Sequence, residues 1–242
     1  NYPGYTFVAP VVTEKGNTLH YSKEEGFFRM FPFVQGSSSI DVVETSEQAF
    51  EAAKQFGRFT KLLSGFDCHQ LKITIPSFHD LSLRYQQFLT ALEKGNKIRI
   101  AESKELIGKL IRYSGIADEY KRILMDSSFK LRVTHHDTKI SNVLFNENGK
   151  GLCVIDLDTL MPGYFISDVG DMMRTYLSPV SEEEKNFSKI EVRVDFYKAI
   201  VRGYFSEMKD ELTEAEKHSF FYAGKFMIYM QAIRFLADHF NN

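Results

Sequence analysis

The chain has 242 residues, of which 43% are hydrophobic and 26% charged, a composition typical of a globular protein with a sizeable core. Its 30 basic and 32 acidic residues leave a formal net charge of −2, which disfavours nucleic acid and anionic membranes as partners. No apolar run reaches the roughly 20 residues that span a bilayer. Cys68 and Cys153 lack metal-binding spacing, so we expect reduced packing residues and a cytoplasmic location.

The start of the chain is predicted to be a small antiparallel β unit. Residues 6–12 and 27–34 are β-prone runs separated by turn-like sequences. The stretch QGSSS at residues 35–39 is the best candidate for a flexible linker. We therefore divide the chain into a β unit over residues 1–34 and a mostly helical body over residues 35–242, an α+β fold.

The body is predicted to be helical on both sides of a short β-hairpin. Apolar residues recur every three or four positions over residues 45–65, 80–94, 102–125, 167–177, 188–208 and 213–240. The third helix has a predicted interruption at Ser114 and Gly115, and two helices open with the capping boxes Thr45 to Gln48 and Thr213 to Glu216. Brief strands are predicted in LRVTH, NVLF and LCVIDL, with NENGKG as the turn between the last two.

The most informative stretch is HHDTKISN, residues 135–142. Phosphoryl transfer explains its residue types, because a carboxylate such as Asp137 can take the proton of an acceptor hydroxyl. Asn142 and Asp156, at the end of the next hairpin strand, supply the hard oxygens that hold Mg²⁺ beside phosphates. Lys139 is spaced to neutralise charge on the transferred group, and Asp158 can assist the metal or cap a turn.

The blocks HHDTKISNVLF, CVIDLDTLMPG and SDVGDMMR resemble the aminoglycoside phosphotransferase and choline kinase superfamily. The combination of DTK, IDLDT and MPG most resembles its bacterial N-acetylhexosamine 1-kinase branch. The resemblance runs from about residue 5 to the end and implies a protein-kinase-like two-lobe fold with a truncated N-terminal β lobe.

The resemblance also implies roles for individual residues. Asp137 would be the catalytic base, Asn142 and Asp156 would bind Mg²⁺, and Asp158 would assist the metal or the phosphates. Residues 1–34 would be the remnant of the N-terminal lobe and the hinge, where the backbone around Pro32, Phe33 and Val34 would bind the adenine of ATP. The glycine-rich loop and the nucleotide lysine of kinases are not found before this hinge, so we expect part of that lobe to be missing from the sequence.

Several neighbouring polar residues have structural interpretations. We expect His135 to donate to a backbone carbonyl near the loop and Asp168 to bond back to the loop. The position of His136 leaves a solvent-facing and a substrate-side role open. Asp171 and Arg174 have the i, i+3 spacing of a helical ion pair, or they face the acceptor.

The first functional hypothesis is an ATP- and Mg²⁺-dependent small-molecule kinase that phosphorylates the anomeric hydroxyl of an N-acetylhexosamine, an amino sugar. A second hypothesis keeps the fold and changes the acceptor to choline, homoserine or an aminoglycoside. A third is a non-catalytic nucleotide-binding module with a kinase-like fold. The sequence leaves the oligomeric state, and the choice between ATP and GTP, open.

Overall fold

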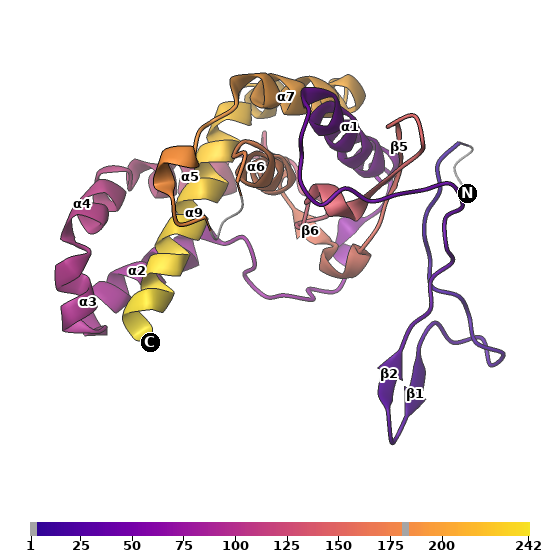
Figure 1. Cartoon of the computed structure of the whole chain (residues 1–242), viewed down its shortest axis with the longest axis horizontal. Helices are drawn as coiled ribbons and strands as arrows, with labels where there is room; N and C mark the ends of the chain where they lie inside the picture. The colour runs from indigo at the N-terminus through magenta and orange to yellow at the C-terminus, as the bar shows by residue number, and fades with distance from the viewer. Residues whose placement is uncertain (1–3, 181–183) are drawn as a thin grey trace.

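The computed structural model describes residues 4–180 and 184–242. It consists of a thin N-terminal segment attached to a helical body, and Figure 1 shows the segment extending away from the helices. The first three residues of the predicted β unit lie outside the described ranges. No helix among the described residues is long and apolar enough to cross a membrane.

The N-terminal segment contains less β-structure than predicted. Strands β1 (His20–Ser22) and β2 (Gly26–Phe28) form an antiparallel hairpin. The prediction of strands over 6–12 and over the rest of 27–34 is wrong, and only one backbone bond, from Val11 N–H to the oxygen of Met30 at 2.8 Å, joins these runs. Both runs contain a proline, Pro10 or Pro32, which has no N–H to continue a ladder.

The predicted linker is tied to the body. Ser38 and Phe145 exchange two backbone hydrogen bonds, each of 2.9 Å, and so form an isolated antiparallel bridge. The serine-rich sequence therefore adds a short edge to strand β4 (Val143–Phe145), and it holds the end of the N-terminal segment beside the hairpin.

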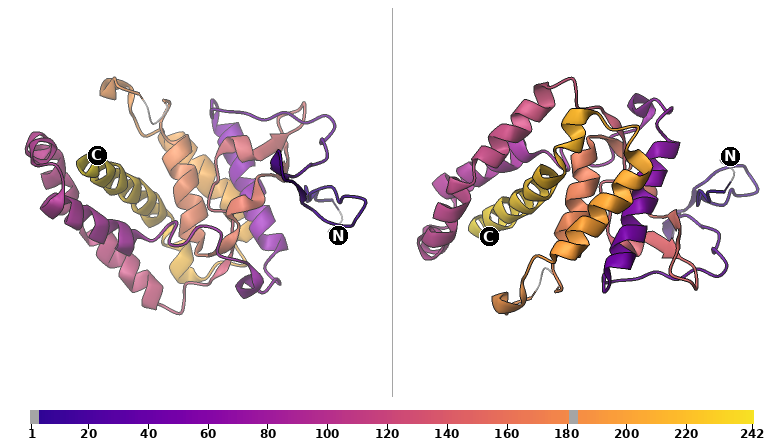
Figure 2. Two further views of the ribbon diagram at one scale, coloured as in Figure 1. Left: turned by 90° about the horizontal axis from the view of Figure 1, so that it is seen from below. Right: turned by 90° about the horizontal axis from the view of Figure 1, so that it is seen from above.

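Two groups of helices share the long helix α9 (Phe220–Asn241). Helices α1 (Ser46–Leu62), α6 (Phe165–Tyr176) and α7 (Val194–Met208) form one group. The other consists of α2 (Leu81–Lys94), α3 (Lys97–Glu102), α4 (Lys104–Arg112) and α5 (Gly115–Met125). Figure 2 shows α9 running between the two groups, and it packs against both α6 and α2.

Most helix predictions are confirmed. The break at Ser114 and Gly115 separates α4 from α5, and both capping boxes form. The helix predicted over 213–240 is instead two helices, the short α8 (Glu214–Lys217) and α9, while α7 begins later than predicted, at Val194. Helix α3 was missed because Gly95 interrupts the apolar pattern, although Asn96 then caps a new helix.

Two pairs of short strands carry the polar loop. Strand β3 (Arg132–Thr134) pairs antiparallel with β6 (Met161–Gly163), and β4 forms the predicted hairpin with β5 (Gly151–Val154). Strand β6 was missed because its sequence, MPG, contains two residues that are rare inside strands. Cys68 and Cys153 are buried and free, as predicted.

Candidate active site

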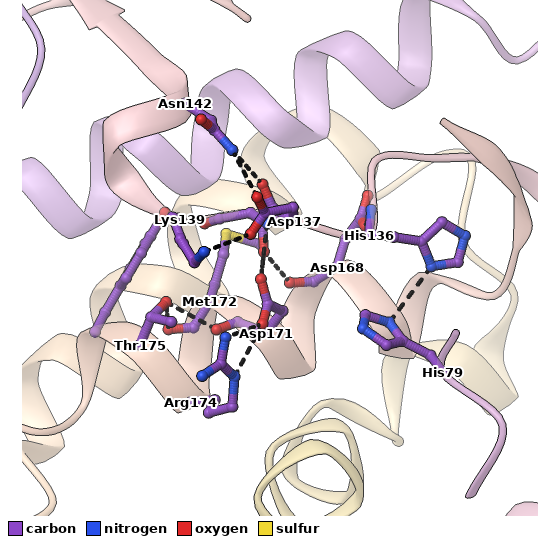
Figure 3. A network of polar contacts seen from close by, with 12 residues as sticks. His79, His136, Asp137, Lys139, Asn142, Asp168, Asp171, Met172, Arg174 and Thr175 are labelled. Carbon is purple, nitrogen blue, oxygen red and sulfur yellow. Dashed lines mark hydrogen bonds and ion pairs between the residues drawn. The ribbon is translucent and has the colours of Figure 1, made fainter. Parts of the chain in front are cut away.

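Two aspartates of helix α6 bind the backbone of the loop between β3 and β4. Asp168 accepts the backbone N–H groups of His135 at 3.1 Å and His136 at 2.8 Å, and Asp171 accepts that of Thr138 at 2.8 Å. Asp137 is therefore flanked on both sides by backbone groups bonded to one helix (Figure 3). The predicted bond from Asp168 back to the loop is confirmed.

Asp168 is a buried carboxyl group whose contacts favour its charged form. Burial raises its pKa to about 7, while the N–H groups of His136 and His135 act in the opposite direction. Each carboxyl oxygen accepts one backbone N–H of the loop, so the carboxyl group of Asp168 acts as a hydrogen-bond acceptor there.

His135 is structural, as predicted. Its ring is fully buried, with Nε2 at 3.0 Å from the carbonyl oxygen of Ile155, and its Nδ1 accepts the backbone N–H of Asp137 at 3.3 Å. Because Nδ1 is an acceptor, Nε2 carries the proton and donates it to Ile155. Burial lowers the pKa of His135, which favours this neutral ring.

His136 is not solvent-facing. It is buried, its backbone has a φ of 67°, and its Nδ1 lies 3.4 Å from Nδ1 of His79. Both histidines line a cavity of about 260 Å³ together with Tyr120 and Tyr164. Burial lowers the pKa of each to about 3, so both rings are neutral near neutral pH.

The structure leaves Asp137, the carboxylate that the sequence predicted to be the base, partly open. A quarter of its side chain, 25%, is exposed. Asn142 donates from Nδ2 to the backbone oxygen of Asp137 at 2.9 Å and to its Oδ2 at 3.2 Å. Lys139 Nζ lies 3.4 Å from Oδ1, so a cation stands beside the predicted base.

Asn142 lies directly before strand β4 and Asp156 lies just after strand β5, so the hairpin brings the two residues together. The carbonyl oxygen of Asn142 accepts the N–H of Ile155 at 2.9 Å, which places Asp156, the next residue, beside it. Because Asn142 uses Nδ2 to hold Asp137, its Oδ1 remains for a metal. A carboxylate and an amide oxygen are ligands that Mg²⁺ accepts together with phosphate oxygens, so these two residues would fit that ion.

Asp156 has an unusual backbone for a non-glycine residue. Its φ of 58° and ψ of 63° lie in the left-handed region. Such a conformation persists where the surroundings enforce it, and it aims the side chain out of the regular strand direction. The side chain lines a cavity of about 600 Å³.

The same cavity brings together the predicted nucleotide-binding residues. Its walls include Pro32, Phe33 and Val34 from the N-terminal segment and Leu144 and Ile155 from the hairpin. Mostly apolar walls with a few polar groups, here Arg29, Asp156 and Asp158, are typical of a small-molecule pocket of this volume. The hinge-like segment and the expected metal ligand thus face one space.

Asp158 makes a contact that the sequence did not predict. Arg29 donates to both of its oxygens, from Nη1 to Oδ1 at 2.7 Å and from Nη2 to Oδ2 at 2.5 Å. The pair spans the same cavity, and its hydrogen bonds lower the pKa of Asp158. A metal role for Asp158 would require this exposed ion pair to open.

Asp171 and Arg174 form the predicted pair, with Asp171 Oδ1 at 3.0 Å from Nε and 2.8 Å from Nη2. The pair is more buried than a surface helix pair, with 3% of the Asp171 side chain and 14% of the Arg174 side chain exposed. Asp171 also accepts from Thr138, so its carboxylate supports the loop.

Sequence reasoning missed Arg29, His79 and Thr138 as members of this region. Their partners lie 129, 57 and 33 residues away, and no local pattern reports such distances. For Thr138 a signal exists, since it lies beside Asp137, while Arg29 adjoins the predicted hinge.

The sequence and the fold were compared with those of known proteins. Residues 8–214 match the model of the family described as "Phosphotransferase enzyme family". The fold is similar to an aminoglycoside phosphotransferase from Alicyclobacillus acidocaldarius, with a TM-score of 0.52 and 12% identity over 98% of this chain and 79% of that one. It is also similar to a choline kinase from Cryptosporidium parvum, with a TM-score of 0.53 and 14% identity over 92% of this chain and 68% of that one.

These likenesses confirm the predicted kinase-like α+β fold. The family match confirms the enzyme class, a phosphotransferase. The chain belongs to the phosphotransferase enzyme family.

Proposed function

We propose that the chain transfers the γ-phosphoryl group of ATP to the anomeric hydroxyl of an N-acetylhexosamine, with Mg²⁺ as cofactor. The observation that carries the phosphoryl-transfer part is the position of Asn142, which holds Asp137 through its amide and adjoins Asp156 across the hairpin. The sugar is supported by the DTK, IDLDT and MPG sequences.

Each residue of the site has its own role in the proposed phosphoryl transfer. Asp137 accepts the proton of the hydroxyl and orients it for in-line attack, while Lys139 stabilises negative charge on the transferred group. Asn142 and Asp156 would hold Mg²⁺, which neutralises phosphate charge. Asp158 would assist once its pair with Arg29 opens.

The nucleotide would bind in the 600 Å³ cavity, with adenine against Pro32, Phe33 and Val34. In this proposal residues 1–34 are the end of the N-terminal lobe and its hinge, and residues 35–242 are the catalytic lobe. Asp171, which accepts the N–H of Thr138, would support the loop, and Arg174 would contact the acceptor directly.

A coupled assay with Mg²⁺ and ATP tests this function. The acceptors are GlcNAc, GalNAc, glucose, choline and kanamycin, and phosphorus NMR identifies the phosphorylated position. Turnover of the acetylated sugars to anomeric phosphates supports the proposal. Turnover confined to choline or kanamycin contradicts the sugar assignment, and it favours the second hypothesis.

A further inference from the structure

Arg29 contacts a carboxylate of the cavity of about 600 Å³ through two parallel hydrogen bonds. It donates from Nη1 to Oδ1 of Asp158 at 2.7 Å and from Nη2 to Oδ2 at 2.5 Å. Among the described residues that line this cavity, Arg29 alone has a basic side chain. Asp156, the expected metal ligand, lines the same cavity two residues before Asp158.

The backbone beside Arg29 is bonded within the N-terminal segment. The N–H of Val11 donates to the oxygen of Met30, the residue after Arg29, at 2.8 Å. The guanidinium of Arg29 lies 5.4 Å from the ring centre of Phe31, which lines the cavity together with Pro32. Arg29 therefore links the segment proposed to bind adenine with the carboxylates at the expected metal.

The pair of Arg29 with Asp158 is open to solvent. The exposed fraction is 40% for the Arg29 side chain and 54% for the Asp158 side chain. Ion pairs with this exposure contribute at most about 1 kcal/mol, because water and salt screen the charges. A stronger partner can therefore separate the two groups, and such partners are a divalent cation for the carboxylate and a phosphate for the guanidinium.

The guanidinium presents its donors in a geometry that suits a phosphate. Arginine has a planar fork of N–H groups, and phosphate oxygens accept these groups in pairs, as carboxylate oxygens do. In the structure the two oxygens of Asp158 accept the bonds of this fork. Two phosphate oxygens can accept the same two bonds.

The charges in this part of the cavity also require a cation beside a phosphate. Asp156 and Asp158 are carboxylates, and like charges repel an incoming phosphate group. Hydrogen bonds and the charge of Asp158 raise the pKa of Arg29, and the charge of Asp156 raises it further. Arg29 is thus protonated near neutral pH, and it is the cation that the described cavity wall supplies.

We propose that Arg29 binds a phosphate group of the nucleotide in exchange for its pair with Asp158. The exchange would also release the carboxylate of Asp158, which can then assist the metal. This inference rests on the proposed function, because it takes the cavity of about 600 Å³ as the nucleotide site. It adds to that site a residue that recognises phosphate.

Calorimetric titrations with ATP and with adenosine, at saturating Mg²⁺, test the phosphate contact. In Arg29→Gln we expect ATP to bind about 10- to 100-fold more weakly, the range of a hydrogen bond to a charged group. Adenosine has no phosphate, so its affinity should stay unchanged. Unchanged ATP affinity, or equal weakening of both ligands, overturns the inference. At saturating ATP the Mg²⁺ requirement of Arg29→Gln should not rise, since Arg29 contacts the phosphate and not the metal.

Two further variants separate a specific contact from general charge attraction. Arg29→Lys keeps the charge without the fork and should recover part of the ATP affinity. Lys23→Gln is the matched control, because Lys23 is exposed between β1 and β2 on the same segment and its loss changes the net charge equally. ATP affinity that falls as much in Lys23→Gln as in Arg29→Gln overturns the inference.

A double-mutant cycle tests the exchange, with ATP titrated in EDTA so that no metal is bound. Asp158→Asn releases Arg29 and removes a negative charge, and both changes should strengthen ATP binding. Only the second change operates when Arg29→Gln is also present. We therefore expect a smaller gain from Asp158→Asn in the Arg29→Gln protein than in the wild type. Equal gains would show that Asp158 does not compete for Arg29 and would overturn the exchange.

The same titrations distinguish this inference from the proposed function. ATP binding that depends on Arg29, in a protein that phosphorylates no N-acetylhexosamine, contradicts only the acceptor assignment. Turnover of these sugars with equal ATP affinity in wild type and Arg29→Gln contradicts only the role of Arg29. A wild-type protein that does not bind ATP contradicts both.

Discussion

The carboxylate of Asp168 on helix α6 accepts the backbone N–H of His136 at 2.8 Å, one residue before the proposed base. Its other oxygen accepts the N–H of His135. The backbone that leads into Asp137 is thus held by a buried side chain on helix α6, 32 residues further along the chain than His136.

Asp168→Asn should lower kcat by about 100-fold, the cost of misplacing a reacting group by about 1 Å. The amide has one acceptor oxygen in place of two, so one backbone N–H loses its partner and the loop shifts. Steady-state kinetics and a nucleotide titration measure the effect, and KM for ATP should stay close to the wild-type value. An unchanged kcat would show that α6 does not position Asp137.

His79 should make the protein sensitive to acid. Its pKa falls from 6.5 to about 3 on folding, so between these values the unfolded chain binds a proton that the folded chain refuses. Above about pH 6.5 His79 is neutral in both states and does not affect the free energy of unfolding. As the pH falls below 6.5, the unfolded chain takes up the proton and the free energy of unfolding decreases. The charges of Arg174, Arg234 and Arg84 also lower this pKa, and the ring of His136 lies beside His79, with the two Nδ1 atoms 3.4 Å apart.

Urea unfolding of the wild type and of His79→Asn at pH 7.5 and pH 5 isolates this effect, since the other titrating groups, Asp168 included, are common to both. The free energy of unfolding should fall less on acidification in the variant. An equal fall in both proteins would mean that His79 does not contribute.

Arg132→Met should destabilise the fold strongly. Arg132 donates from Nη1 and Nη2 to the two oxygens of Glu216, at 2.5 and 2.9 Å, and the Glu216 side chain has 0% exposure. Removal of the arginine leaves a buried carboxylate without its cation, which costs about 3–5 kcal/mol. Arg122→Met, on the exposed pair with Glu119, should cost less than about 1 kcal/mol in the same urea titration.

Asp158→Asn separates two roles of one carboxylate. Its pair with Arg29 is exposed, so its loss should change the free energy of unfolding by less than about 1 kcal/mol. If Asp158 also assists the metal, the Mg²⁺ concentration for half-maximal activity rises in Asp158→Asn and not in Arg29→Gln. A rise in both variants would assign the effect to the ion pair.

The sequence predicted those parts of the site that one hairpin contains. Asp137, Asn142 and Asp156 lie within 20 residues, and the NENGKG turn folds Asp156 back beside Asn142. Helix caps such as Thr45 were also predictable, because a capping box is a local pattern.

Contacts across the chain were not predictable in this way. The three-residue sequence of strand β6 is typical of a turn. It forms a strand because it pairs with β3. The proline residues of the N-terminal segment limit β-pairing where β-prone composition suggested strands. The packing of α9 against both α2 and α6 is likewise a contact across the chain that periodicity does not report.

The measurement that tests the central claim most directly compares wild type with Asp137→Asn, by turnover of the best acceptor and by calorimetric binding of Mg²⁺ and ATP. The asparagine keeps the size and the polar contacts to Asn142 but cannot accept the proton. We predict that kcat falls by about 100- to 10,000-fold, the typical contribution of a general base, while nucleotide affinity is retained. Full turnover in Asp137→Asn, or loss of nucleotide binding together with turnover, would contradict the assignment of Asp137 as the base.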